Sequence, residues 1–281
     1  MHKKAFRITI FLRIFAKETQ QTPLEQLRIT QRISTMNNTK VDIMVSTADD
    51  QFSAQTAFNL IKILNEMGIE TNYPLQQTSC GKELYETGDF NGAKELGEKT
   101  MRQFSGKQNI VCTSSAWVAY MRRVFPTMYF NTAFHIENQE FCKRIHDITD
   151  FLVNICGTTC VNNSFPHRVL FVDNCQTLND YPLHDEPRVL LRNTQGLELV
   201  DTTPEFESTC CGFGSLGFAS DFEPVSTELA RRKVEFAINA GAEVITSTDT
   251  ACLLHLQSYI NRKKLDLRCV HIIDILASKN A

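Results

Sequence analysis

Residues 209–214 read Thr-Cys-Cys-Gly-Phe-Gly, and residues 78–81 read Thr-Ser-Cys-Gly. Each motif is set in its own run of strand-like apolar segments that alternate with helix-like amphipathic segments. A motif that recurs with its surroundings indicates duplication. The sequence therefore predicts two similar lobes, the first spanning residues 41–160 and the second residues 161–281.

The segments around the two motifs predict an α/β fold. Apolar runs bounded by turn residues predict strands, and apolar residues at helical spacing that end at glycine predict helices. Strands are predicted at 41–46, 70–73, 109–112, 169–172, 197–200, 244–246 and 268–272. Helices are predicted after residue 57 up to Gly68, at about 90–104, 117–124, 141–155, 189–192 and 250–260, and at 227–240 with a stop at Gly241. Alternating strands and helices give mostly parallel, Rossmann-like sheets, which place ligands beyond the carboxyl ends of their strands.

The composition is that of an ordinary globular protein, with 281 residues, 42% hydrophobic and 22% charged, and a formal net charge of −3. Residues 1–40 carry eight Lys/Arg against two Glu, so the rest of the chain is acidic. Nucleic-acid affinity depends on Lys and Arg that displace counterions from phosphates, so an acidic body argues against nucleic-acid binding.

Residues 1–40 form a basic N-terminal extension with three interpretations: a targeting leader, a basic arm, or an overextended start that precedes a true start at Met36. Arg7 and Arg13 interrupt its apolar stretch well before the ~20 residues that a membrane span requires, so no transmembrane segment is expected. Ten cysteines without a secretory signal predict reduced thiols or metal ligation in the cytoplasm.

Four of the cysteines lie where predicted strands end. Cys175 follows a strand, Cys210 and Cys211 precede a glycine-rich turn, and Cys252 begins a helix after the strand at 244–246. Loops at the carboxyl edge of a parallel sheet converge, and adjacent cysteines are awkward partners for a mutual disulfide. Metal ligation by these four residues, named here the four-cysteine site, is the better interpretation.

Gly212 and Gly214 are expected to let the backbone approach a bound group, with their amides donating to sulfur. Residues 212–217 formally match the dinucleotide fingerprint G-x-G-x-x-G, but no strand precedes them as that motif requires. A plain flexible turn is the other alternative.

The pattern C-x34-C-C-G-F-G-x37-C, with Asp249-Thr-Ala-Cys-Leu-Leu254 and Val270-His-Ile-Ile-Asp-Ile-Leu276, resembles the duplicated cysteine-rich "CCG" domain, over about residues 41–277. The chain is most similar to the lactate-utilisation protein A and glycolate oxidase iron–sulfur subunit families. This resemblance implies an oxidoreductase subunit, not active alone, in which the four-cysteine site holds an iron–sulfur cluster, [4Fe–4S] or another type, for electron transfer. It also implies a ferredoxin-like iron–sulfur partner, a third subunit, and a small 2-hydroxy acid, L-lactate above all, that is oxidised to its keto acid.

The first half departs from the family pattern. The family's ligands are matched there to Thr47, Ser79 and Val118, and only Cys80 is still a cysteine. The first lobe is therefore expected to hold no metal and to be structural or to serve docking. In the second half Asp249 stands where the fuller pattern has a cysteine, and it is a candidate oxygen ligand.

Two alternatives of another class stay open. Four cysteines also make a tetrahedral zinc site, which would give a zinc-stabilised interaction module. The missing first-half cysteines are equally compatible with a metal-free scaffold subunit.

Overall fold

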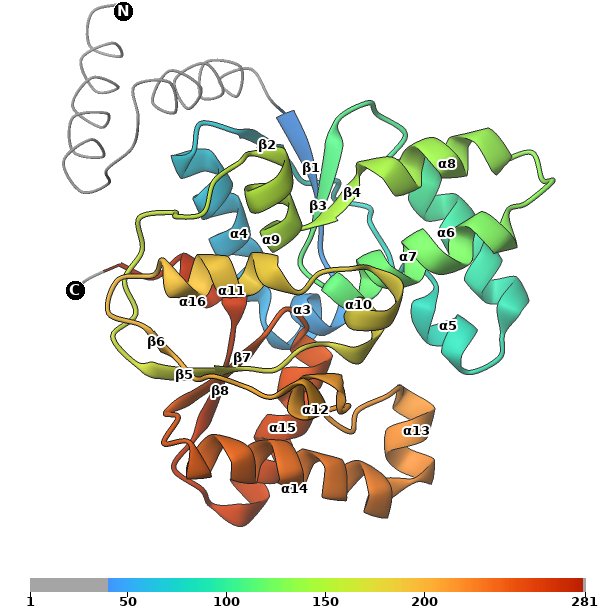
Figure 1. Cartoon of the computed structure of the whole chain (residues 1–281). Coiled ribbons are helices and arrows are strands. Elements are labelled where there is room, and N and C mark those ends of the chain that lie inside the picture. Colours follow the sequence, from blue (N-terminus) through green and yellow to red (C-terminus); the bar gives the residue numbers. More distant parts are fainter. Residues whose placement is uncertain (1–39, 280–281) are drawn as a thin grey trace, which may run out of the picture. The chain divides into compact units, whose positions relative to one another are not determined.

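The computed structural model describes residues 40–279, so the predictions for the N-terminal extension lie, apart from Lys40, outside the described residues. From Lys40 onward the chain forms one compact unit (Figure 1). Its strands are β1 Lys40–Met44, β2 Glu70–Asn72, β3 Asn109–Cys112, β4 Ile145–Asp147, β5 Arg168–Phe171, β6 Glu198–Leu199, β7 Val244–Ser247 and β8 Arg268–His271.

The strands form two four-stranded sheets that repeat one topology. The strand order is β2-β1-β3-β4 in the first sheet and β6-β5-β7-β8 in the second, and every pairing is parallel. The predicted fold class, two Rossmann-like α/β lobes, is thereby confirmed. We call β1 to η1 the first lobe and β5 to α16 the second.

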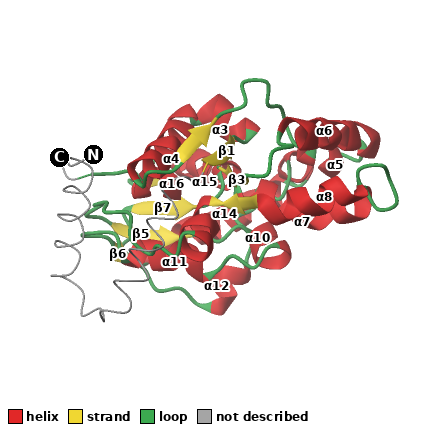
Figure 2. Cartoon of the chain, turned by 90° about the horizontal axis from the view of Figure 1, so that it is seen from above, coloured by secondary structure: helices red, strands yellow, loops and turns green. Residues whose placement is uncertain are grey.

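Helices connect successive strands and lie on both sides of the sheets (Figure 2). They are α3 Thr47–Phe52, α4 Ala54–Glu66, α5 Lys82–Glu86, α6 Phe90–Gln103, α7 Ser115–Met128, α8 His135–Arg144, α9 Ile148–Asp150, the π-helical turn η1 Phe151–Ile155, α10 Cys175–Asp180, α11 Asp185–Arg192, α12 Pro204–Ser208, α13 Leu216–Asp221, α14 Glu223–Asn239, α15 Thr250–Lys263 and α16 Ile272–Leu276. Within residues 40–279, none of them has both the length and the apolar character that crossing a membrane requires.

The central strands are apolar because helices cover both of their faces. Val41, Ile43 and Met44 of β1 are all buried, as a strand in the middle of a parallel sheet requires. Gly68 and Gly241, the two predicted helix stops, have φ of 80° and 67° and follow α4 and α14. This left-handed conformation is cheap for glycine and ends each helix before the next strand.

The single helix predicted over 141–155 is wrong. Residues 145–147 form β4, which pairs with β3, and Asp147 then caps α9 by accepting a hydrogen bond from the Thr149 amide at 2.7 Å. Ile145 and Ile148 are both fully buried, one in the sheet and the other in the helix after it. Their spacing of three residues therefore has two different causes, and the apolar pattern cannot separate them.

Helical segments near the end of each lobe pack on the other lobe. α16 of the second lobe packs on α4 of the first, where Thr56 and Asn59 donate to the Asp274 carboxylate at 3.0 and 2.8 Å. In the same way α9 packs on α11. Just beyond β3 and β7, the Ser115 amide donates to the Thr248 carbonyl at 3.1 Å. The carboxyl edges of the two sheets therefore meet, which is where such sheets carry ligands.

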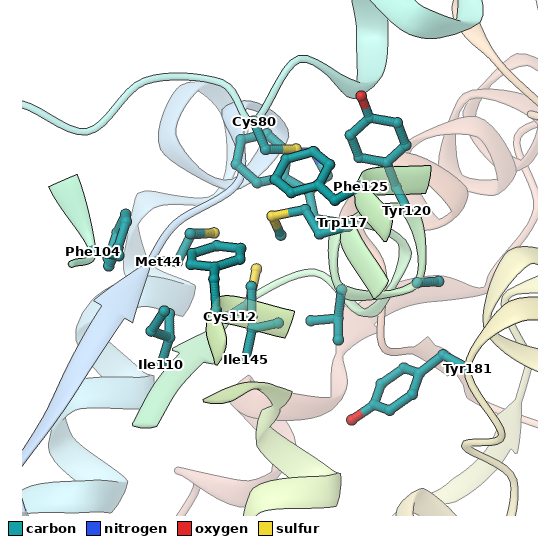
Figure 3. Close-up of a cluster of buried hydrophobic side chains, with 14 of the residues drawn as sticks. Met44, Cys80, Phe104, Ile110, Cys112, Trp117, Tyr120, Phe125, Ile145 and Tyr181 are labelled. Atoms are coloured by element: carbon teal, nitrogen blue, oxygen red, sulfur yellow. The ribbon is translucent and has the colours of Figure 1, made fainter. Parts of the chain in front are cut away.

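Each lobe has its own apolar core. Figure 3 shows the first, in which Met44, Cys80 and Cys112 lie beside the rings of Trp117 and Phe125. Cys80 and Cys112 are fully buried there, and burial raises the pKa of both thiols. These two cysteines behave as small core residues.

Candidate metal centre

The second sheet brings the four predicted cysteines together. Cys175 is the first residue of α10, Cys252 is the third residue of α15, and Cys210 and Cys211 lie in the loop after α12. All three segments lie beyond the carboxyl edge of the second sheet. The structure therefore brings the three cysteine-bearing segments together at that edge, as predicted.

The four sulfurs form a continuous chain of contacts. The Cys175 thiol donates to the Cys210 sulfur at 3.6 Å, and the Cys211 thiol interacts with the sulfurs of both Cys210 and Cys252. The Asn174 side-chain amide donates to the Cys252 sulfur at 3.4 Å. Cys211 and Cys252 are buried, while Cys175 and Cys210 are half-buried, so the site reaches from the core towards solvent.

Among the four sulfurs, that of Cys210 is the one whose negatively charged form is favoured. Hydrogen bonds from the Cys175 and Cys211 thiols, and then from the amides of Gly212 and Gly214, lower the pKa of Cys210. The same contacts raise the pKa of Cys175 and of Cys211, because these two thiols donate to it. Thiolate is the form of cysteine that binds metal, so the loop favours the state that ligation needs.

The turn after the cysteines is closely packed. Gly212 has φ of 100°, and a Cβ there would lie 2.3 Å from the Ser226 carbonyl oxygen. Its amide donates to the Cys210 sulfur at 3.3 Å. Gly214 has φ of 60°, which also favours glycine. Helix α12, not a strand, precedes this turn, so the context of a dinucleotide fingerprint is missing from it.

A cavity of about 170 Å³ opens between the lobes in front of these cysteines. Its walls come from the loops at the carboxyl edges of both sheets. The charged residues among its described lining are Lys82, Glu83, Glu86 and Asp249. Lys82 is paired with Glu86 at 2.6 Å, and this carboxylate raises the pKa of Lys82 although burial lowers it. The formal charges of Glu83 and Asp249 make the cavity negative.

Asp249 acts as a helix cap and as a bridge between the lobes. One of its carboxylate oxygens accepts from the Cys252 amide at 3.1 Å and the other accepts from the Ser114 hydroxyl at 2.7 Å. Both oxygens are therefore engaged in holding α15 and α7. Its earlier interpretation as an oxygen ligand stays a prediction.

The donor set suits metal ligation. In a tetrahedral site with metal–sulfur bonds of about 2.3 Å, the sulfurs lie about 3.8 Å from one another, and Cys175 and Cys210 lie 3.6 Å apart. Among residues 40–279, no three His, Cys, Asp or Glu side chains are placed to hold one ion. Cysteine thiolates with amide donors beside them are also the ligands that iron–sulfur clusters use.

The first lobe has a counterpart of this site built from other residues. Thr47 follows the cap of α3 as Cys175 follows the cap of α10. The Gly81 amide donates to the Ser79 hydroxyl at 3.1 Å, just as Gly212 does to the Cys210 sulfur. Both Gly81 and Gly212 have positive φ. The duplication predicted from the two motifs therefore extends to their backbone geometry.

The residue that matches Cys252 is Trp117, and the prediction of Val118 is wrong. Ser114 caps α7 by accepting from the Trp117 amide, as Asp249 caps α15 by accepting from the Cys252 amide. Trp117 lines the cavity, whereas the fully buried Val118 belongs to the core. A comparison of Ser-Ser-Ala-Trp with Asp-Thr-Ala-Cys, aligned on their capping residues, would have found this match.

Glu83 fills the first-lobe site, a role that the sequence motifs do not indicate. Its carboxylate accepts hydrogen bonds from the Thr47 hydroxyl at 3.0 Å, the Ser79 hydroxyl at 2.5 Å and the Trp117 indole at 3.3 Å. Glu83 lies two residues after Gly81, and the residue two after Gly212 is Gly214. The second lobe thus has no side chain where the first lobe has an anionic one.

Apart from Cys80 of the first-lobe motif, the five remaining cysteines are not part of either site. Cys112 and Cys269 lie in β3 and β8, Cys142 lies in α8 and Cys156 follows η1. Burial raises the pKa of all four of these thiols. None of the ten cysteines, all of which lie in the described range, forms a disulfide.

Comparisons with known proteins agree with the duplicated motif. The sequence model of the CCG cysteine-rich domain matches residues 47–116 and 169–257, more than half of the chain. "Lactate utilization protein A" of Macrococcus caseolyticus is 26% identical over 238 residues, which cover 84% of this chain and 96% of that protein. The protein of the same name from Geobacillus thermodenitrificans is 27% identical over 241 residues, which cover 86% of this chain and all of that protein.

A solved structure shares the fold. A hypothetical protein from Helicobacter pylori superposes with a TM-score of 0.59 at 7% identity, covering 94% of this chain and 56% of that chain. The two segments that the CCG domain model matches lie one in each lobe, and they contain the motifs at 78–81 and 209–214. The chain belongs to the CCG cysteine-rich domain family.

Proposed function

We propose that this chain is an iron–sulfur electron-transfer subunit of a complex that oxidises a small 2-hydroxy acid, most directly L-lactate to pyruvate. The observation that carries the proposal is the chain of four cysteine sulfurs at the carboxyl edge of the second sheet. Cys175, Cys210, Cys211 and Cys252 would hold the cluster, whose chemistry when bound is one-electron transfer. The similarity to proteins named for lactate utilisation supports the choice of substrate.

The charge of the cavity favours electron transfer over substrate binding in this subunit. Lys82 is paired with Glu86, and among the described lining residues no cation forms an ion pair with Glu83 or Asp249. A 2-hydroxy acid also carries a carboxylate, and like charges in a cleft lower the local concentration of such a ligand. We therefore place the oxidation of the acid on a partner subunit.

The stoichiometry sets what this subunit must do. Oxidation of lactate to pyruvate releases two electrons and two protons, so a one-electron carrier turns over twice for each molecule of substrate. The electrons leave through the clusters of a ferredoxin-like partner, and a third subunit completes the complex. Free thiols at the site fit a reducing, cytoplasmic location.

The first lobe contributes structure without metal in this proposal. Its would-be site is filled by the Glu83 carboxylate, which takes three hydrogen bonds from the residues that replace three of the cysteines. Cys80 alone cannot hold a cluster and is buried in the core. One working site and one filled site are therefore expected in each chain.

The test is lactate-dependent electron transfer in the assembled complex. The Cys210→Ser/Cys211→Ser double variant should lose activity, and Cys80→Ser, a matched change at the first-lobe motif, should keep it. Full activity of the double variant would refute the electron-transfer role and favour a scaffold. Loss of activity together with zinc in place of iron would indicate a zinc-stabilised module.

A further inference from the structure

A buried carboxylate of the first lobe contacts the helix that carries Cys252. Asp49 is the third residue of α3, is fully buried, and lies where α3 packs on α15 (Figure 1). One of its carboxylate oxygens accepts from the hydroxyls of Ser46 and Thr113, each at 2.6 Å. The other oxygen accepts from the Thr250 hydroxyl at 2.5 Å. Thr250 is the first residue of α15 and Cys252 is the third, so this contact reaches the first turn of the ligand-bearing helix.

This carboxylate is costly to keep inside the protein. Among residues 40–279, no Lys, Arg or His side chain forms an ion pair with Asp49, so side-chain hydroxyls alone offset the water that it has lost. A buried charge without a counter-charge is weak as a source of stability. A polar network in which every member is satisfied does, however, fix the geometry of the groups that it joins. Geometry is therefore what Asp49 supplies.

The duplication repeats this contact with a different group. Thr177 is the third residue of α10, as Asp49 is of α3, and Ser115 begins α7 of the other lobe. The Thr177 hydroxyl donates to the Ser115 hydroxyl at 2.9 Å, so equivalent positions meet across the lobes. Helix α7 contains no cysteine and is joined by two hydroxyls, whereas α15 contains Cys252 and is joined by a carboxylate. Because a carboxylate is the stronger acceptor, the tighter contact is on the side that carries a ligand.

A second contact from the first lobe holds the same turn. The Ser114 hydroxyl donates at 2.7 Å to one oxygen of Asp249, and the other oxygen accepts from the Cys252 amide at 3.1 Å. The start of α15 is thus attached to the first lobe at residues 249 and 250. Metal ligands depend on such supporting contacts, because small displacements of a ligand weaken the site.

We propose that Asp49 is a positioning residue of the four-cysteine site: through Thr250 it fixes the first turn of α15 and so sets where the Cys252 sulfur meets a bound cluster. This inference rests on the proposed function, because it names what the first lobe contributes to the cluster of the second. The first lobe then helps to hold the cluster although it supplies none of the ligands.

The rival explanation is that this contact only holds the two lobes together. A second contact of the same kind separates the explanations. Thr56, which is also buried, donates to the Asp274 carboxylate at 3.0 Å where α4 meets α16. Neither of these helices contains a cysteine. If the contacts only join the lobes, loss of either threonine hydroxyl has the same consequence for the site, whereas positioning requires the hydroxyl of Thr250 alone.

The test compares Thr250→Val, which removes the hydroxyl and keeps the shape, with Thr250→Ser, which keeps the hydroxyl, and with the matched control Thr56→Val. Iron-loaded chains are mixed with an iron chelator, and the rate of cluster loss is followed by visible absorption. In the metal-free chains, hydrogen–deuterium exchange of the peptide that contains the first turn of α15 is followed by mass spectrometry. Urea unfolding of the same metal-free chains measures how far each change weakens the whole fold.

Thr250→Val should speed both cluster loss and exchange in the first turn of α15 by about tenfold, as expected for the loss of a hydrogen bond to a charged group. Thr250→Ser should return both rates to the wild-type range. Thr56→Val should leave both rates unchanged while it lowers the free energy of unfolding by a similar amount. Because Asp49 acts through Thr250, Asp49→Ala should speed cluster loss less in the Thr250→Val background than in the wild type.

Equal rates for Thr250→Val and Thr56→Val, or wild-type rates for Thr250→Val, would overturn the proposal in favour of a contact that only joins the lobes. The threonine variants decide this even if Asp49→Ala does not fold. Absence of iron from the wild-type protein after reconstitution would refute the proposed function instead. Exchange in the metal-free chains would then still decide whether the contact with Asp49 fixes the first turn of α15.

Discussion

Asp147 carries a specific prediction about stability and pH. It ends β4, is fully buried, and uses one carboxylate oxygen to accept from the amide and the hydroxyl of Thr149 at 2.7 and 2.5 Å. Among the described residues, its other oxygen has no hydrogen-bond partner, and neither has Nε2 of the buried His271. Burial raises the pKa of Asp147 to about 6, against the lowering effect of the Thr149 hydrogen bonds and of His271.

The sign and size of the effect follow from this shift. The pKa of an aspartate in an unfolded chain is about 4, so between pH 4 and 6 the unfolded state releases a proton that the folded state keeps. The contribution of Asp147 to stability is therefore greatest below pH 4, falls through that window and levels off above pH 6. A difference of about two pKa units corresponds to about 3 kcal/mol.

Asp147→Asn should remove this dependence. Asn cannot ionise and keeps an oxygen for Thr149, so the variant should gain about 3 kcal/mol relative to wild type between pH 4 and pH 7, whatever its offset at pH 4. Urea unfolding of both proteins, reduced and in matched buffers, measures this double difference, in which all other titrating groups cancel. An unchanged difference between the two pH values would refute the reasoning.

Three further predictions concern the surroundings of the site. Arg188→Met should lower the free energy of unfolding by about 3–5 kcal/mol, because it leaves the buried Asp173 carboxylate without its partner. Adding Asp173→Asn should recover part of this loss. Equal stability of the single variant and the wild type in urea unfolding would contradict the argument. Gly212→Ala should lower the free energy of unfolding by more than the about 1–2 kcal/mol typical of a strained φ, because its Cβ would lie 2.3 Å from the Ser226 carbonyl oxygen. Gly217→Ala is the control and should change stability little, because nothing lies within 4 Å of its Cβ. Similar melting temperatures for the two variants would be evidence against the packing argument. Each single Ser variant of the four-cysteine site should lose iron while Cys80→Ser retains it, and unchanged iron in all four would sink the ligand assignment.

The strands and the convergence of the cysteines could be predicted from sequence because both follow from local patterns. Buried strands such as β5 contain a continuous apolar run, and loops after parallel strands meet by topology. β4 could not be predicted, because Ile145 and Ile148 fit helical spacing while they belong to different elements. Its identity depends on pairing with β3, which is distant in sequence.

Glu83 was missed at the site for a different reason. Its role comes from three hydrogen bonds to residues that lie far from it in sequence or in other elements. No spacing within the motif indicates these contacts.

The central claim, that the four-cysteine site holds an iron–sulfur cluster, is tested most directly by metal analysis of the anaerobically purified chain. Iron, acid-labile sulfide and zinc are measured per chain, together with visible absorption before and after dithionite. For a cubane cluster the account predicts about four irons and four sulfides, with absorption that bleaches on reduction. Zinc without iron, or no metal even after reconstitution with iron and sulfide, would contradict it.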